Sequence, residues 1–131
     1  GGHGLFSTLK DYAQFARMLI DGRSADGHVL LARKTLEMMR ANRIPPDQLP
    51  LTIGMNPLPG YGWGLGVRVM MDVGKAMALT GHGELGWAGA ASTYFFVDPA
   101  ESLFGVFMTQ YLGASLPLNE ELRVAAYQML E

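Results

Sequence analysis

Residues 91–97, with the sequence ASTYFFV, and residues 103–110, with the sequence LFGVFMTQ, carry the clearest fold signal in this chain. Both runs are apolar and rich in aromatic and β-branched residues, which favour extended strands. The five residues between them, DPAES at 98–102, are typical of a turn. The pattern predicts two neighbouring strands joined as an antiparallel hairpin.

Upstream of this hairpin the chain alternates between bulky and small residues. Over 63–71, WGLGVRVMM, the alternation predicts one strand with a packed face and a second face left bare by glycines. Residues 72–75 indicate a turn into a further short strand at 76–79. Five prolines within 41–60 predict a long irregular connection.

Three segments instead repeat their apolar residues at three- and four-residue steps, which is typical of amphipathic helices: 9–20, 33–40 and 118–129. Thr8 and Asp11 fit a capping box at the first helix, and Gly22 is suited to end it. The order is two helices, an antiparallel sheet and a closing helix, without β-α-β alternation. This order predicts an α+β fold, with an antiparallel sheet flanked by helices, in one domain over 1–131.

Composition excludes several classes of function. The chain has 131 residues and a net charge of -2, and its ten Lys and Arg residues are scattered, which argues against nucleic-acid binding. The uncharged aromatic stretch 85–97 is too short to span a membrane. There is no cysteine, so disulfides and thiolate metal sites are excluded. His3, His28 and His82 lack metal-ligand spacing, and we expect neither a metal nor a cofactor.

Residues 86–92, GWAGAAS, form the most informative stretch for function. Small residues that run directly into a strand leave backbone N–H and C=O groups free on an unobstructed strand edge. Such an edge can donate to an oxyanion or pair with an extended substrate as an added strand. Trp87 would then supply an apolar wall. The alternative is a glycine-rich loop with one core tryptophan. His82, between Gly81 and Gly83, either approaches a ligand or lies in a tight turn.

Ser7 and Lys10 match S-x-x-K, a pairing in which lysine activates a serine nucleophile. The same residues also suit a helix start, where Ser and Thr act as caps. The capping interpretation is the favoured one.

Several segments together resemble one family. GHGLFST at 2–8 followed by DYAQFA at 11–16, GYGWGLG at 60–66, and LFGVFMTQ at 103–110 resemble segments of class C beta-lactamase-like proteins, penicillin-binding relatives and related esterases. Trp87-Ala88-Gly89 resembles the W-x-G form of their third motif. The resemblance covers essentially the whole chain and implies the C-terminal part of the beta-lactamase/transpeptidase-like fold.

The resemblance also implies an acyl-enzyme mechanism on ester, lactam or amide carbonyls, in which the N–H of Ala90 supplies one oxyanion donor. The family's S-x-x-K and tyrosine motifs lie upstream of the segment that matches residues 2–8. This chain is therefore expected to be inactive alone. No cation stands at Trp87, which favours ester substrates, and Glu84 stands where an H-x-G motif would need glycine. The expected substrate-binding residues are Trp87, Ala88, Gly89, Ala91 and His82.

The expected partners are a small ester or lactam substrate and the upstream part of the parent chain, with self-association through exposed apolar surface. Localisation stays open between the cytoplasm and the periplasm of a bacterium. A catalytically inactive module that binds peptides through its sheet edge is the alternative function.

Overall fold

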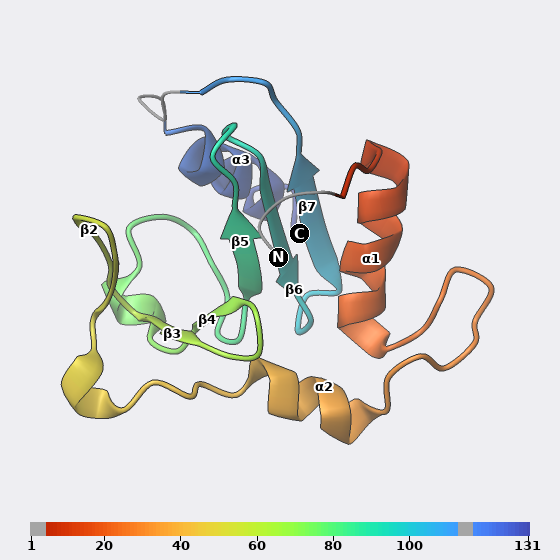
Figure 1. Cartoon of the computed structure of the whole chain (residues 1–131), viewed down its shortest axis with the longest axis horizontal. Helices are drawn as coiled ribbons and strands as arrows, with labels where there is room; N and C mark the ends of the chain where they lie inside the picture. The colour runs from red at the N-terminus through yellow and green to blue at the C-terminus, as the bar shows by residue number, and fades with distance from the viewer. Residues whose placement is uncertain (1–4, 113–116) are drawn as a thin grey trace.

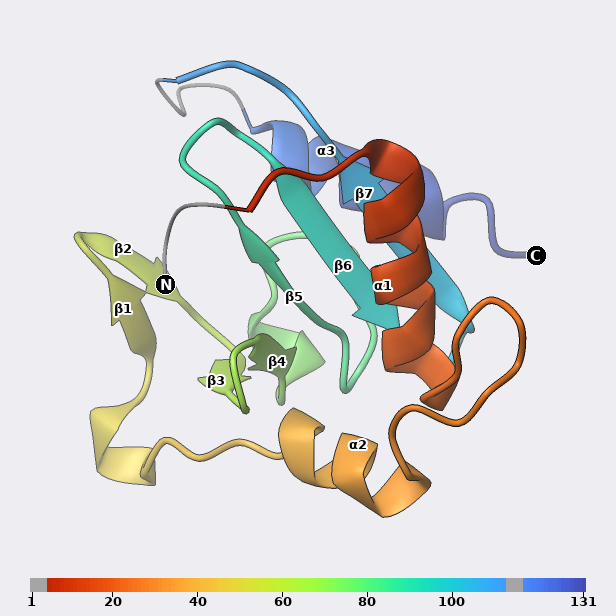
Figure 2. The ribbon, with the colours of Figure 1, turned by 45° about the vertical axis from the view of Figure 1, so that its right-hand side comes forward.

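The computed structural model describes residues 5–112 and 117–131, and its centre is a five-stranded antiparallel sheet (Figure 1). The strand order follows the chain: β3 (Tyr61–Trp63), β4 (Arg68–Met70), β5 (Leu85–Ala88), β6 (Tyr94–Asp98) and β7 (Leu103–Phe107). Helix α1 (Leu9–Asp21) covers one face and α3 (Leu118–Tyr127) the other, while α2 (Arg33–Arg40) runs across one end (Figures 1 and 2). The predicted α+β fold is confirmed.

The alternation of side chains along β6 divides the core between the two faces of the sheet. Phe95 and Val97 belong to a cluster with Ala16 and Leu19 of α1. Tyr94 and Phe96 belong to a second cluster with Ala126 of α3. Every residue of β6 is buried, which explains why this stretch has the strongest apolar signal in the sequence.

The predicted hairpin is present, with β6 and β7 paired over five residues each, from Tyr94 opposite Phe107 to Asp98 opposite Leu103. Its connection is four residues, because Asp98 belongs to the strand. The Asp98 carboxylate accepts hydrogen bonds from the N–H groups of Ala100 (3.0 Å) and Glu101 (3.3 Å), which folds the connection into a tight turn.

The prediction of a single strand over 63–71 is wrong. The segment turns back on itself, so that β3 and β4 pair with Trp63 opposite Arg68. The N–H of Gly64 bonds to the C=O of Val67 at 2.8 Å, and Gly66 has φ 84°, a conformation that costs glycine little. The glycines that suggested a bare strand face therefore form a turn.

Two other expectations for the connections need correction. The strand predicted at 76–79 is absent, and that segment follows a 3₁₀ turn, η2 (Val73–Lys75). The segment 41–60 is not wholly irregular, since it contains η1 (Pro46–Gln48) and a small hairpin of β1 (Leu51–Ile53) and β2 (Asn56–Leu58). Gly54, with φ 61°, makes the turn of that hairpin.

The helix boundaries follow the predicted caps. Thr8 Oγ1 accepts a hydrogen bond from the N–H of Asp11 at 3.2 Å and donates one to its carboxylate at 2.9 Å. Gly22 ends α1 with φ 79°, and its N–H bonds to Met18 O at 2.7 Å. Helix α2 has the predicted bounds. Among the described residues, no helix has the length and apolar character needed to cross a membrane.

Candidate functional site

The stretch singled out in the sequence forms the end of β5 and the turn that connects it to β6. Trp87 and Ala88 pair with β6, and a four-residue turn over 89–92 follows. The N–H of Ser92 closes this turn by donating a hydrogen bond to Gly89 O at 3.1 Å. The N–H of Gly89 also bonds to Thr93 O at 2.7 Å, and Ser92 has φ 56°. Ala90 therefore occupies the second position of the turn.

β5 is not an outer strand of the sheet, which corrects part of the sequence-based expectation. Leu85 and Gly86 pair with β4 on one side and with β6 on the other. Pairing with β4 ends at Gly86, so Trp87 and Ala88 have a strand partner only in β6. The open edge is thus restricted to the last two residues of β5 and the turn after them.

The chain after β7 holds this turn in place. Thr109 Oγ1 donates to Ala91 O at 2.6 Å, and Ser92 Oγ donates to Tyr111 O at 2.9 Å. Thr93 packs so closely that a Cβ at Gly89 would collide with its hydroxyl oxygen. Sequence reasoning missed the supporting role of these residues, because a hydroxyl side chain on a strand end has no distinctive pattern.

Two backbone donors of the turn remain available. Within the described part of the chain, the N–H groups of Ala90 and Ala91 donate to no acceptor, as is usual for the central residues of such a turn. Ala90 is exposed and Ala91 half-buried. An anion or carbonyl oxygen can therefore reach the Ala90 N–H without displacing an internal hydrogen bond.

Trp87 lies on the α1 face of the sheet, where it packs against the cluster of Leu85 and Val69. Its ring meets Trp63 of β3 edge to face, with 4.5 Å between the ring centroids and an interplanar angle of 87°. Both tryptophans are half-buried. The apolar wall expected from Trp87 is therefore a pair of indoles.

The structure places His82 at the opposite end of β5 from Ala90. Its side chain is exposed, and its loop bonds to the end of β4 through Gly83 N–H and Met70 O at 2.8 Å. Gly81 N–H bonds to the Tyr127 hydroxyl at 3.2 Å. The strand itself separates His82 from the turn, so the two are not brought together, and a substrate role for His82 stays a prediction.

A buried ionic cluster, which the sequence analysis did not identify, fixes the start of β5. Glu84 is fully buried, and its carboxylate receives Arg68 (3.4 Å), Arg123 (3.3 Å) and the Thr80 hydroxyl (2.6 Å). The other residues of the cluster are Tyr61 and Tyr94, whose hydroxyls accept from Arg123 and Arg68 respectively.

The cluster lies between the sheet and α3 and holds the guanidinium groups in their charged form. Burial by itself lowers the pKa of Arg123, but Tyr94, Tyr61 and Glu84 more than offset that effect and leave it raised. Burial raises the pKa of Tyr94, which keeps its hydroxyl protonated. The cluster thus anchors α3 and β5 to each other.

The remaining sequence candidates do not form a site. Ser7 is exposed and donates to Thr8 O at 3.4 Å, and within the described residues it forms no hydrogen bond with Lys10. His28 is exposed beside Asp26 at 3.4 Å. His3 lies outside the described residues. In 5–112 and 117–131 no group of three or more His, Asp or Glu side chains could hold a metal ion.

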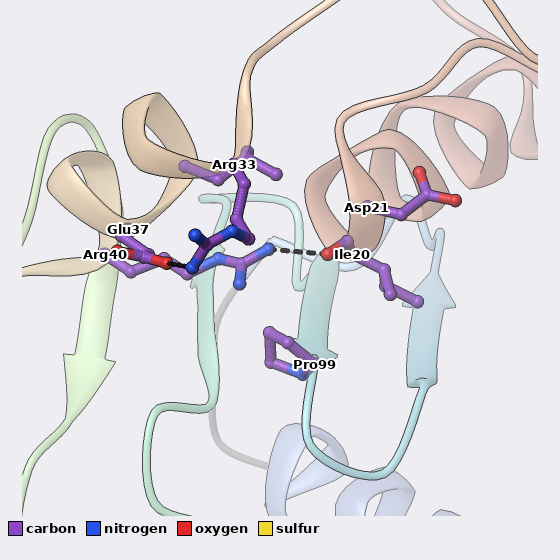
Figure 3. Close-up of a pocket in the computed structure, with 7 residues that line it drawn as sticks. Ile20, Asp21, Arg33, Glu37, Arg40 and Pro99 are labelled. Atoms are coloured by element: carbon purple, nitrogen blue, oxygen red, sulfur yellow. Dashed lines mark hydrogen bonds and ion pairs between the residues drawn. The ribbon is translucent and has the colours of Figure 1, made fainter. Parts of the chain in front are cut away.

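A concavity of about 410 Å³ lies away from the turn, at the end of β6 marked by Pro99 (Figure 3). Arg40 crosses it and donates to the C-terminal carbonyls of α1 at Leu19 and Ile20. Ala90 lies at the other end of β6, so this concavity is not part of the candidate site. Its lining residues are Ile20, Asp21, Arg33, Leu36, Glu37, Arg40 and Pro99.

The antiparallel sheet, with one helix layer on each face, matches the beta-lactamase/transpeptidase-like fold of solved structures. The chain belongs to the Beta-lactamase family, whose profile matches residues 1–128.

The relatives are considerably longer than this chain. It is 34% identical over 114 residues to two curated proteins of Mycobacterium tuberculosis, "Uncharacterized protein MT1414" and "Protein Rv1367c", and the match covers 84% of this chain and 28% of each relative. The chain thus corresponds to less than a third of their length.

Solved structures share the fold. The LovD6 mutant of simvastatin synthase (LovD) from Aspergillus terreus superposes with a TM-score of 0.74 at 20% identity, over 95% of this chain and 33% of that one. EstCE1, described as a hydrolase with promiscuous acyltransferase activity, gives 0.68 at 23% identity, over 88% and 28%. A penicillin-binding protein homolog from Caulobacter crescentus gives 0.68 at 21% identity, over 88% and 30%.

Proposed function

We propose that this chain is the C-terminal part of a serine hydrolase that cleaves ester, lactam or amide carbonyls through an acyl-enzyme intermediate. Its contribution is the strand end 87–88 and the following turn, where the N–H of Ala90 donates to the oxyanion. In this proposal the nucleophilic serine, its lysine and a tyrosine lie upstream of residue 1 in the complete protein, and the serine's own N–H is the second oxyanion donor. The length of the relatives, of which this chain covers 28%, leaves room for such a region.

The observation that carries this proposal is the exposed Ala90, whose N–H has no acceptor in the described chain, on a turn anchored by Thr109 and Ser92. An oxyanion donor accelerates a reaction only when it is fixed before charge develops, because reorganising a mobile dipole would consume the gain. The two hydroxyl contacts supply that fixation. The half-buried tryptophans beside the turn exclude water from one side of the reacting carbonyl.

The neighbours' descriptions fit acyl transfer. EstCE1 is described as a hydrolase with promiscuous acyltransferase activity. An acyl-enzyme intermediate accounts for both reactions, since water or another nucleophile can resolve the same ester. Oxyanion donors without a nucleophile have no reaction to accelerate, so the 131-residue chain alone is expected to be inactive.

The test is covalent labelling with a fluorophosphonate. The complete protein is expected to form a stoichiometric adduct on a serine upstream of residue 1, and the 131-residue chain is expected to form none. Intact-mass and peptide mass spectrometry measure both results.

The control is Ser7→Ala in the complete protein, which should label as the wild type does. An adduct on Ser7 of the 131-residue chain would overturn the proposal in favour of the Ser7/Lys10 pairing. If the complete protein folds but does not label, the inactive module that binds peptides at the open end of β5 becomes the better explanation.

A further inference from the structure

The two tryptophans of the sequence contact each other in the fold. Trp63 comes from β3 and Trp87 from β5, on opposite sides of β4, and their rings meet edge to face at 4.5 Å. The pairing of β4 with β5 ends at Gly86, one residue before Trp87. An edge-to-face pair at this distance is an attractive aromatic geometry.

Trp63 is held firmly through its backbone. Its N–H donates to Asn42 Oδ1 at 3.0 Å, and its C=O accepts the N–H of Arg43 at 2.7 Å. Asn42 is itself fixed by two hydrogen bonds with Ile44, of 2.9 and 2.8 Å. A Cβ at the neighbouring Gly62 would collide with the Asn42 side chain, so the loop lies directly against β3. The aromatic wall is thus preformed.

The indole pair is not sealed inside the core. Both side chains are half-buried, and neither indole N–H has an acceptor within 5–112 and 117–131. Tryptophan presents a large apolar surface, so a half-buried pair of indoles beside the open end of β5 can bind an apolar group.

The cationic side chains nearest to the pair in sequence and sheet register, Arg68 and Arg43, already have hydrogen-bond partners in the fold. Arg68, opposite Trp63 in the β3–β4 register, is buried and bound to Glu84 and Tyr94. The Arg43 side chain donates to Met38 O at 3.1 Å. Recruiting Arg68 to a ligand carboxylate would strip Glu84 of a buried partner, which is costly. The wall therefore suits an uncharged ligand.

We infer that Trp63 is a specificity-determining residue, which together with Trp87 binds the uncharged apolar acyl group of an ester substrate. The inference rests on the proposed function for the orientation of the substrate, because Ala90 lies three residues beyond Trp87 on the same hairpin. It goes further by naming the residue on β3 and the class of acyl group.

The first experiment uses kinetics of the complete protein on p-nitrophenyl esters from acetate to octanoate. Trp63→Leu is expected to lower kcat/KM for octanoate about tenfold through KM, in the range expected for loss of one or two methylene-sized contacts. The value for acetate should change less than about twofold, because acetate is too short to use the wall. Trp63→Phe should restore most of the preference for long acyl chains.

The matched control is Phe107→Leu on β7, a half-buried aromatic packed on the α3 face of the sheet, away from the pair. It should leave the chain-length preference unchanged. An unchanged preference in folded Trp63→Leu would overturn the inference while leaving the proposed function intact.

If the complete protein hydrolyses no ester, the proposed function fails, and a binding measurement then tests the inference by itself. The protein is labelled with 5-fluorotryptophan, the resonances of Trp63 and Trp87 are assigned from the Phe variants, and 2-octanone is titrated against 7-oxooctanoate. The ketone should shift both resonances saturably and bind about tenfold more tightly than its carboxylated counterpart, as for an uncharged site. Equal binding of the two ligands, or no shift with either, would overturn the inference.

Discussion

Glu84→Leu is expected to lower the free energy of unfolding by about 3–5 kcal/mol, the range found when one partner of a buried ion pair is removed. Glu84 is the carboxylate that both Arg68 and Arg123 contact, and all three side chains are buried. The substitution leaves two guanidinium groups without a counter-charge in the core between the sheet and α3. Urea denaturation followed by circular dichroism measures the loss.

The matched control is Glu37→Leu, which removes a carboxylate that also contacts two cations, Arg33 and Lys34. Those partners are exposed, and water replaces the lost carboxylate, so the denaturation midpoint should change little. If Glu84→Leu shifts the midpoint no more than Glu37→Leu does, the ionic cluster is not what anchors α3 to β5.

The parts of the fold that the sequence predicted are those set by local interactions. The hairpin of β6 and β7 has two apolar strands separated by only four residues, and Asp98 closes its own turn. Helix α1 likewise carries its signals at its ends, with the Thr8 side chain at one and the left-handed Gly22 at the other. Each feature depends on residues a few positions apart.

The errors arose where one pattern permits two structures. The sequence 63–71 alternates in size, and alternation of this kind fits either a continuous strand or two short strands around a glycine turn. The choice depends on whether Gly66 takes a positive φ, and glycine takes either sign with little cost. In the fold, the N–H of Leu65 in this turn donates a hydrogen bond to the carbonyl of Met39. Such a contact arises from tertiary packing and leaves no signal in the sequence 63–71.

The residues of the candidate site also fall into two groups, those that a local sequence pattern marks and those that only the fold brings together. The residues of the turn were identified because small residues next to a tryptophan form an unusual local pattern. Their supports were not, since Thr109 is 18 residues from Ala91 and Trp63 lies two strands away from Trp87. The ionic cluster is the extreme case, with Arg68 and Arg123 16 and 39 residues from Glu84. Only the fold brings such groups together.

Ala90→Pro in the complete protein is expected to reduce turnover of ester substrates about 100- to 1,000-fold, the usual effect of losing one oxyanion donor. The structure makes proline a clean substitution here. Ala90 is the second residue of the turn, a position that proline favours, and it does not have a positive φ. Its N–H has no acceptor in the described chain, so proline removes the donor without breaking an internal hydrogen bond.

Ala90→Gly is the matched control, because it changes the side chain at the same position but keeps the N–H. It should retain turnover close to that of the wild type, and both variants should keep the wild-type circular dichroism spectrum. The reduction should appear in kcat and in kcat/KM equally, because the donor acts on charge that develops only in the transition state. If folded Ala90→Pro turns over esters at the wild-type rate, the oxyanion donor is not at Ala90, and the His82 loop at the other end of β5 becomes the next candidate for the third motif.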